Sequence, residues 1–150
     1  FGASCKSGVI VSEGNAEQQN AAYDYGFNLG LAFQIIDDLM DFSNLTDKMG
    51  KNLGYDFKLG KTTLTVILAW QKSNPKEKQF WVRTLKELNQ KPNDFNNAID
   101  IFNKYNIFSE CKKKTEQFIS LSVKSLKKLP DTEIKNHLIG LANESIERSK

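Results

Sequence analysis

The chain has 150 residues, of which 39% are hydrophobic and 26% charged, and its formal net charge is +3. This composition predicts one folded unit with enough apolar material for a core. No apolar run approaches the ~20 residues of a membrane span, so no transmembrane segment is expected. Arginine occurs only at Arg83 and Arg148, whereas nucleic-acid-binding faces concentrate basic charge and use arginine. We therefore expect no nucleic-acid partner.

The two cysteines and the start of the chain bear on its location. Cys5 and Cys111 have neither CxxC nor metal-ligand spacing, which favours free thiols in a reducing compartment. Residues 1–11 lack the charged start and long apolar middle of a signal peptide. These features indicate a cytoplasmic protein. Because the chain begins with Phe1 rather than Met, an N-terminal portion is expected to be missing.

In chain order, the pattern predicts helices, and no alternating strand pattern is found. We expect an all-α fold. The expected helices cover about 16–43, about 62–71, a segment that begins after Asn74, 93–105, a segment along the stripe that ends near 129, and a last helix capped by Asp131. A polar loop, DKMGKNLGYDFKLG, occupies 47–60.

Caps and apolar stripes support these helices. Asn74 is followed by Pro75 and by Glu77, the pattern of a capped helix start, and Pro130 is expected to end a helix. Side chains expected to face inward are Phe95, Ile99 and Phe102, then Phe108, Cys111, Thr115, Phe118, Ser122, Leu126 and Leu129, and finally Leu138, Leu141, Ala142 and Ile146. His137, the only histidine, lies among polar neighbours and is expected to be solvated.

The stretch GLAFQIIDDLMDF, at 30–42, carries three carboxylates and no cation. At 100° per residue, Gly30, Gln34, Asp37, Asp38 and Asp41 fall within one arc of roughly 100°, and apolar residues fill the remainder. A helix that is apolar over most of its circumference is buried, so the acidic stripe is expected to face an internal cavity. Like charges there repel one another unless something positive lies between them.

The positive partner is expected to be a metal ion together with lysines. Oxygen ligands without nearby His or Cys favour Mg²⁺ or Ca²⁺. Lys51 and Lys61 each follow a glycine in the loop and can reach the acidic cluster, with Lys58 between them, an arrangement suited to a bound diphosphate. A solvated acidic patch is the simpler alternative. The segment 54–62 is not a P-loop, because five residues separate its glycines and no strand precedes it.

These motifs resemble those of the trans-type polyprenyl diphosphate synthases. GLAFQIIDDLMDF is similar to the family's second aspartate-rich motif, and GKNLGYDFKLGKTTL is similar to the GKxxGxDxxxGKxTL segment that follows it. FWVRTL and LPDTEIKNHLIGLANESIERS resemble the long-chain branch, the octaprenyl and decaprenyl synthases that make quinone (ubiquinone) side chains. The chain departs from the pattern at Thr65, where the family generally has Pro, and at Tyr55, where this branch often has an acidic residue.

The resemblance implies an antiparallel helical bundle of the isoprenoid synthase type around a central cavity, usually a homodimer, with 1–150 as the C-terminal part of one domain. It implies Mg²⁺ at Asp37, with Asp38 and Asp41 as direct or water-mediated partners. Lys51 and Lys61 would contact the allylic diphosphate, for example farnesyl diphosphate. Phe33 and Gln34 would line the approach of isopentenyl diphosphate.

The implied reaction is prenyl transfer: an allylic diphosphate ionises, the double bond of isopentenyl diphosphate attacks the cation, and a proton leaves. The family's first aspartate-rich motif is absent from these residues, so the piece alone is expected to be inactive and its product length is undecided. Farnesyl or geranylgeranyl length stays open. Rival interpretations are a terpene cyclase, a non-catalytic subunit of a heteromeric synthase, and an unrelated helical interaction module.

Overall fold

The structure, a computed structural model, describes residues 1–42 and 53–147. Within these ranges every regular element is a helix, which confirms the all-α class. The elements are α1 (Gly2–Val11), α2 (Ala16–Met40), α3 (Tyr55–Lys58), α4 (Leu64–Lys72), α5 (Pro75–Trp81), the π-helix η2 (Val82–Lys86), α6 (Asp94–Lys104), α7 (Ile107–Ser125), the 3₁₀ helix η3 (Leu126–Lys128) and α8 (Glu133–Glu147). None of these helices is long and apolar enough to cross a bilayer.

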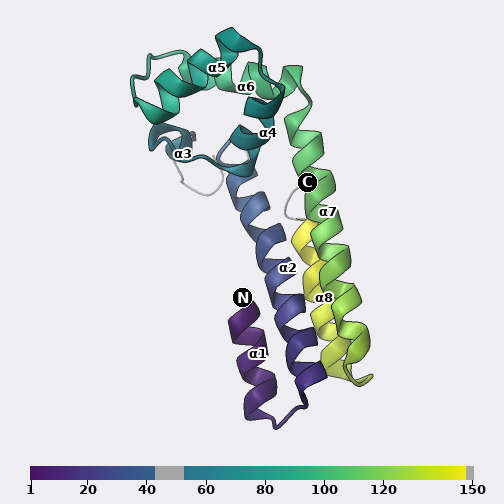
Figure 1. Ribbon diagram of the computed structural model, residues 1–150. Coiled ribbons are helices and arrows are strands. Elements are labelled where there is room, and N and C mark those ends of the chain that lie inside the picture. Colours follow the sequence, from purple (N-terminus) through teal and green to yellow (C-terminus); the bar gives the residue numbers. More distant parts are fainter. Residues whose placement is uncertain (43–52, 148–150) are drawn as a thin grey trace. The chain divides into compact units, whose positions relative to one another are not determined.

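The chain forms two compact units, residues 1–36 with 113–150 and residues 37–112. In the first unit, long helical segments of α2, α7 and α8 run alongside one another, and both termini belong to this unit (Figure 1). Its buried core consists of Tyr25, Leu29, Ala32, Ile119, Leu126 and Ala142. The Tyr25 hydroxyl donates to the carbonyl of Leu138 at 2.9 Å, and Ser122 Oγ donates to the Tyr25 carbonyl at 3.0 Å. The polar groups of this core are therefore paired.

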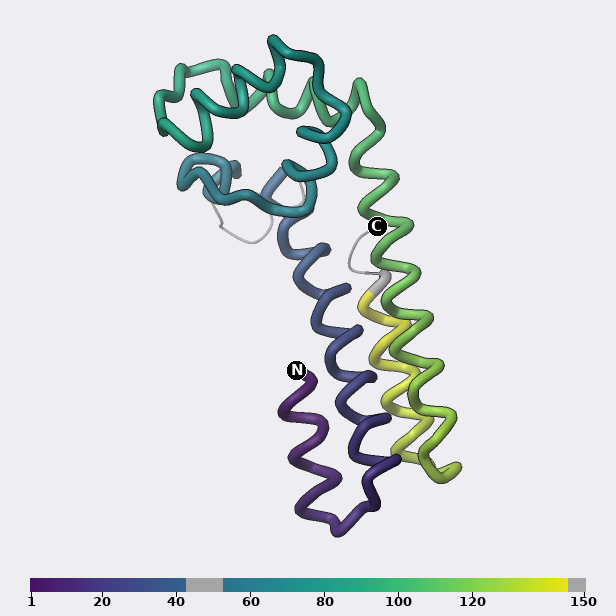
Figure 2. Tube along the Cα trace, in the orientation of Figure 1, coloured from purple at the N-terminus to yellow at the C-terminus, as the bar shows by residue number. Residues whose placement is uncertain are grey.

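The second unit is built from short helices, between which the chain repeatedly reverses (Figure 2). Its interior is aromatic: ring centroids 4.9–5.8 Å apart join Phe42, Phe57, Trp81, Phe95, Phe102 and Phe108. Trp81 is buried, and its Nε1 donates to Ser73 Oγ at 3.0 Å. These large rings contribute apolar burial that short helices cannot provide through long stripes.

The expected helices agree with the observed ones apart from their ends. The helix expected over 16–43 ends at Met40, and the one expected over 62–71 is α4. Asn74 accepts from the Glu77 amide at 3.0 Å while the Glu77 side chain accepts from the Asn74 amide at 2.8 Å, which confirms the cap. Two helices were not expected: α1, and α3 inside the segment expected to be loop.

The start of α8 corrects the sequence prediction. Thr132, and not Asp131, caps this helix, because Thr132 Oγ1 accepts from the Lys135 amide at 3.2 Å. Asp131 instead pairs with Lys135 Nζ at 2.7 Å. Leu141, expected to face inward, is 50% exposed, whereas Ile139 packs against the core. Ile146 is within α8, but its side chain lies outside the described residues.

The other expected stripes largely hold. On α7 and η3 the buried members are Cys111, Thr115, Ser122 and Leu126, and on α6 Phe102 is fully buried while Phe95 and Ile99 are half-buried. His137 is exposed, as expected. Both cysteines are free thiols, and Cys111 is the buried one.

Gly26 allows α1 to lie close to α2. A Cβ added at Gly26 would lie 2.7 Å from the carbonyl oxygen of Phe1 and 2.7 Å from Cys5 Sγ. The Phe1 oxygen is part of the backbone and accepts from the Cys5 amide at 3.0 Å, so it cannot move without breaking the first turn of α1. A side chain at position 26 therefore separates the two helices.

We expect Gly26→Ala to lower the free energy of unfolding by about 1–3 kcal/mol, because the added methyl overpacks the contact between the helices. Thermal unfolding followed by circular dichroism measures the change. Gly8→Ala on α1 is the matched control, since a Cβ there meets nothing within 4 Å. The control should stabilise by about 0.5–1 kcal/mol. Equal melting temperatures for the two variants would contradict the close approach.

Arg83 and Asp94 form a bidentate ion pair in the second unit, with NH1 to Oδ2 at 2.7 Å and NH2 to Oδ1 at 2.9 Å. Asp94 Oδ2 also accepts from the Lys91 amide at 2.7 Å, and Asp94 is 3% exposed. The Arg83 guanidinium, followed by the Lys91 amide, lowers the pKa of Asp94 from 3.8 to about 2. The ionised carboxylate thus fixes the start of α6 to η2.

Because the folded-state pKa of Asp94 lies below its unfolded value, its stabilisation is complete above about pH 4 and is lost as pH falls toward 2. We expect Asp94→Asn to lower the free energy of unfolding by about 2 kcal/mol at neutral pH, and the difference from wild type to shrink below pH 4. Urea unfolding at several pH values measures it. Asp100→Asn, an exposed change on the same helix, should alter stability by less than about 0.5 kcal/mol. A pH-independent difference would refute the linkage.

Candidate functional site

The acidic residues lie where α2 ends. Asp37 and Asp38 are in the last turn of α2, and Asp41 follows it. Asp37 is exposed, Asp38 is buried at 9% exposure, and Asp41 is half-buried. The acidic side chains expected on one arc of the helix are therefore only partly accessible to solvent. All three residues belong to the second unit.

Phe33 and Gln34 precede the aspartates on α2 and belong to the first unit. Gln34 is exposed, as expected for the polar arc. Phe33, which lies outside the polar arc, is 40% exposed. Its ring lies 5.5 Å from the ring of Phe1, and the rest of the side chain remains accessible.

Asp41 connects the end of α2 to α3. Its Oδ1 accepts from the Tyr55 amide at 2.9 Å and its Oδ2 accepts from the Asp56 amide at 3.0 Å. The backbone carbonyl of Asp41 accepts from the Gly54 amide at 2.9 Å. The carboxylate thus satisfies backbone donors at the start of α3 that have no partner within the helix.

Burial raises the pKa of Asp41, and the neighbouring Asp56 carboxylate adds to the rise, while backbone amide donors oppose it. Burial therefore disfavours the ionised form of Asp41, and the backbone amides favour it.

Lys61 lies next to this cluster. Its Nζ is 2.5 Å from Asp56 Oδ1, and its backbone amide donates to the Asp56 carbonyl at 3.0 Å. The Asp56 carboxylate raises the pKa of Lys61, with further contributions from Asp38 and Asp41. Lys61 therefore lies in the electrostatic field of Asp38 and Asp41 as well as that of Asp56. Its side chain is 54% exposed and remains accessible to a ligand.

The remaining predicted lysines differ in what the structure shows. Lys58 is exposed at the end of α3. Lys51 lies outside the described residues. No role was predicted for Asp56, although it is the acidic position of GKxxGxDxxxGK. The place of Asp56 in this motif could have marked it as a site residue. Its role becomes clear only in the structure, where it pairs with Lys61.

Two glycines of the motif have left-handed backbone conformations, Gly54 with φ 73° and Gly60 with φ 70°. A Cβ at Gly54 would lie 2.6 Å from the Phe95 ring, so this position is both strained and crowded for other residues. Thr65, where the resemblance expects Pro, lies in the first turn of α4 with its Oγ1 2.6 Å from Thr63 Oγ1. Both threonine and proline are suited to position 65, because the backbone amides in the first turn of a helix have no acceptor within the helix.

Among residues 1–42 and 53–147, no three His, Cys, Asp or Glu side chains are arranged to hold a metal ion. The donor set of Asp37, Asp38 and Asp41 nevertheless consists of carboxylate oxygens alone, the ligands of hard cations. Mg²⁺ takes few carboxylates and completes its shell with water and phosphate oxygens. The chemistry of these residues therefore fits Mg²⁺ held jointly with a diphosphate.

We expect Asp41→Ala to speed amide exchange at Tyr55 and Asp56, because both donors lose their acceptor. Asp41→Asn, which retains one side-chain oxygen, should have a smaller effect. Hydrogen exchange measured by NMR or mass spectrometry tests this order, with α5 as the internal reference. Wild-type exchange at both amides in Asp41→Ala would contradict the capping role.

The polyprenyl synthetase family model matches residues 1–102. The chain is 35% identical over 152 residues to a prenyl transferase of Cyanidium caldarium, with 99% of this chain and 44% of that protein covered. It is 30% identical over 150 residues to octaprenyl diphosphate synthase of Escherichia coli (100% and 46%) and 33% identical over 154 residues to decaprenyl-diphosphate synthase subunit 1 of Schizosaccharomyces pombe (98% and 38%).

Solved structures agree with these relatives. A decaprenyl diphosphate synthase from Rhodobacter capsulatus superposes with a TM-score of 0.91 at 33% identity, covering 100% of this chain and 46% of that one. A polyprenyl synthase from Caulobacter crescentus, complexed with calcium and isoprenyl diphosphate, gives 0.87 at 31% identity, covering 100% and 45%. The chain spans just under half the length of most of these proteins. It belongs to the polyprenyl synthetase family.

Proposed function

We propose that the protein containing this chain is a Mg²⁺-dependent trans-polyprenyl diphosphate synthase, which extends an allylic diphosphate with isopentenyl diphosphate. The observation that carries the proposal is the position of Lys61 in the field of Asp38, Asp41 and Asp56, within a chain of this family. Cationic and anionic groups side by side suit a diphosphate bound through a metal on one side and lysine on the other.

Asp37 would hold Mg²⁺, and Asp38 and Asp41 would assist directly or through water. When bound, the metal supplies neutralisation of the diphosphate charge. The calcium and isoprenyl diphosphate named for the Caulobacter crescentus neighbour support this pairing of divalent cation and ligand.

The chain's own lysines would bind the diphosphate and stabilise its departure. The bond between the allylic carbon and the diphosphate oxygen breaks, the double bond of isopentenyl diphosphate forms the new carbon–carbon bond, and a proton leaves the resulting cation. Negative charge grows on the diphosphate in the transition state, where Lys61 and Lys51 would be placed to stabilise it. Because Lys61 pairs with Asp56 at 2.5 Å, ligand binding involves sharing or exchanging that partner.

Phe33 and Gln34 would line the approach of isopentenyl diphosphate. The exposed ring of Phe33 is suited to shield the allylic cation from water, since apolar walls exclude the competing nucleophile. The domain is proposed to be completed by residues beyond this chain that carry the first aspartate-rich motif. The 150-residue piece alone would then be inactive.

The product is proposed to be a long prenyl chain for a quinone side chain, because the relatives are named octaprenyl and decaprenyl synthases. We further propose that the protein is a homodimer and lies in the cytoplasm. The free thiols of Cys5 and Cys111 suit a reducing compartment. An alternative is membership in a heteromeric synthase as a subunit that needs a partner. The name of the Schizosaccharomyces pombe relative, subunit 1, favours keeping this alternative.

The test is an assay of the full-length protein with farnesyl diphosphate, isopentenyl diphosphate and Mg²⁺, with products sized by mass spectrometry. We expect a ladder that ends at one long prenyl length and disappears on chelation of Mg²⁺. Asp37→Ala should lower kcat by roughly 100-fold or more, because charge stabilisation in the transition state is lost, while the fold is retained.

Asp24→Ala, an exposed change on the same helix, is the control and should retain activity within about twofold. Wild-type turnover in Asp37→Ala would refute the metal assignment. A folded protein that yields no product would favour the subunit alternative, and activity on addition of a partner subunit would establish it.

A further inference from the structure

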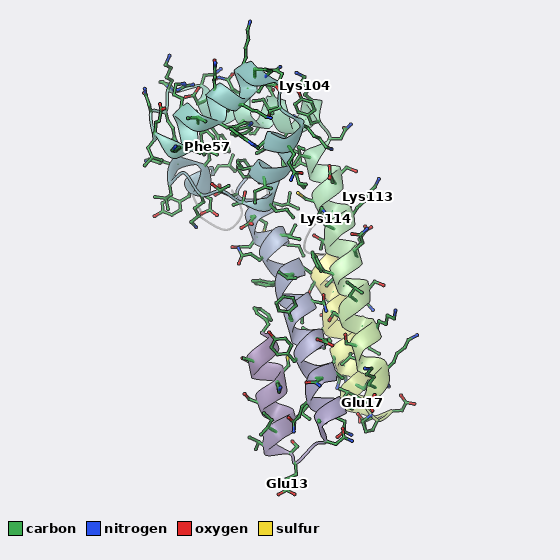
Figure 3. The ribbon with its side chains drawn as sticks, viewed as in Figure 1. Glu13, Glu17, Phe57, Lys104, Lys113 and Lys114 are labelled. Atoms are coloured by element: carbon green, nitrogen blue, oxygen red, sulfur yellow. The ribbon has the colours of Figure 1, made fainter. Side chains whose placement is uncertain are left out.

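We propose that Gln90 is a positioning residue for the candidate site, a role that rests on the proposed function. Its side-chain Nε2 donates to the carbonyl of Phe57 at 2.8 Å and to the carbonyl of Thr84 at 2.9 Å. Phe57 lies in α3 and Thr84 in η2, so one amide group ties the two helices together. Figure 3 labels Phe57 on its short helix.

The π-helical geometry of η2 creates the need for this donor. At its end, the Glu87 amide donates to the Val82 carbonyl and the Asn89 amide donates to the Arg83 carbonyl. Thr84 is fully buried, and its carbonyl accepts from Gln90 at 2.9 Å. A buried carbonyl without a partner is costly. The Gln90 amide supplies that partner and reaches α3 with the same nitrogen.

A second contact holds the same segment against η2. A Cβ added at Gly60 would lie 2.5 Å from the Leu85 carbonyl oxygen and 2.5 Å from Leu88 Cδ2. The backbone at Gly60 therefore lies directly on the end of η2. Gly60 is the residue before Lys61, so this contact fixes the point from which the lysine side chain departs.

The two contacts determine where Lys61 lies. The Phe57 carbonyl, held by Gln90, also accepts from the Gly60 amide at 3.0 Å. From Gly60 the chain enters Lys61, whose amide and ammonium both bind Asp56 on α3. Gln90 acts on Lys61 only through this backbone. It is thus a positioning residue and not a catalytic one.

Glutamine is chemically suited to this place because one primary amide nitrogen carries two N–H donors for two carbonyl acceptors. Leucine has a similar volume and no donor. Glutamate is nearly isosteric, but when ionised it presents only acceptors to the two carbonyls. Both replacements remove the link while keeping the size of the side chain.

The experiment compares the full-length wild type with Gln90→Leu, Gln90→Glu and the control Gln79→Leu, an exposed change on α5 in the same unit. Hydrogen exchange of residues 55–61 reports the position of the segment without depending on activity. Steady-state kinetics with farnesyl diphosphate report kcat and KM. Isothermal titration with inorganic pyrophosphate and Mg²⁺ reports ground-state binding.

We expect both Gln90 variants to exchange residues 55–61 about tenfold faster or more, with α5 unchanged. Their kcat should fall roughly 10- to 100-fold, as expected for a displaced group that acts on the transition state. The KM and the affinity for pyrophosphate should change less than about threefold. The control should match the wild type in every measurement.

Unchanged exchange of residues 55–61 would overturn the proposal, as would faster exchange with wild-type kcat. Faster exchange over the whole unit would show a merely structural role and overturn it equally. An inactive wild type would contradict the proposed function alone. The exchange of residues 55–61 would then decide by itself whether Gln90 holds the segment.

Discussion

The second unit is organised by the need to keep several carboxylates close together where α2 ends and α3 begins. Burial raises the pKa of Asp41, and the negative charge of Asp56 raises it further. The structure offsets this with backbone amides at Asp41 and with the Lys61 ammonium on Asp56 at 2.5 Å. Carboxylate oxygens gathered in this way are the ligands that hard divalent cations prefer.

The elements around this cluster hold it by contacts that do not touch a ligand. Gly54 and Gly60 permit the left-handed turns on either side of α3, and the π-helix η2 carries the carbonyl that Gln90 joins to Phe57. Glycine adopts this left-handed conformation without the steric cost that other residues pay.

The local signals in the sequence predicted local structure well. Reciprocal hydrogen bonds between Asn74 and Glu77 form as expected, since a cap needs only neighbouring residues. The prediction for Asp131 was wrong because Thr132 stands one position nearer to the free amide, while Asp131 found Lys135. The expectation that Leu141 faces inward was wrong for another reason. Helical periodicity assigns a residue to a face, but the packing of neighbouring helices decides how much of that face is covered.

The sequence by itself determined the helical class, the acidic residues at the end of α2 and the lysine-bearing segment that follows, because these depend on composition, periodicity and motif spacing. Only the tertiary structure decided that Asp41 caps α3, that Asp56 partners Lys61, and that Gln90 joins α3 to η2. The Gln90 contacts span 33 and 6 residues of sequence. Such pairings depend on how the chain folds back on itself, which no local pattern of side chains specifies.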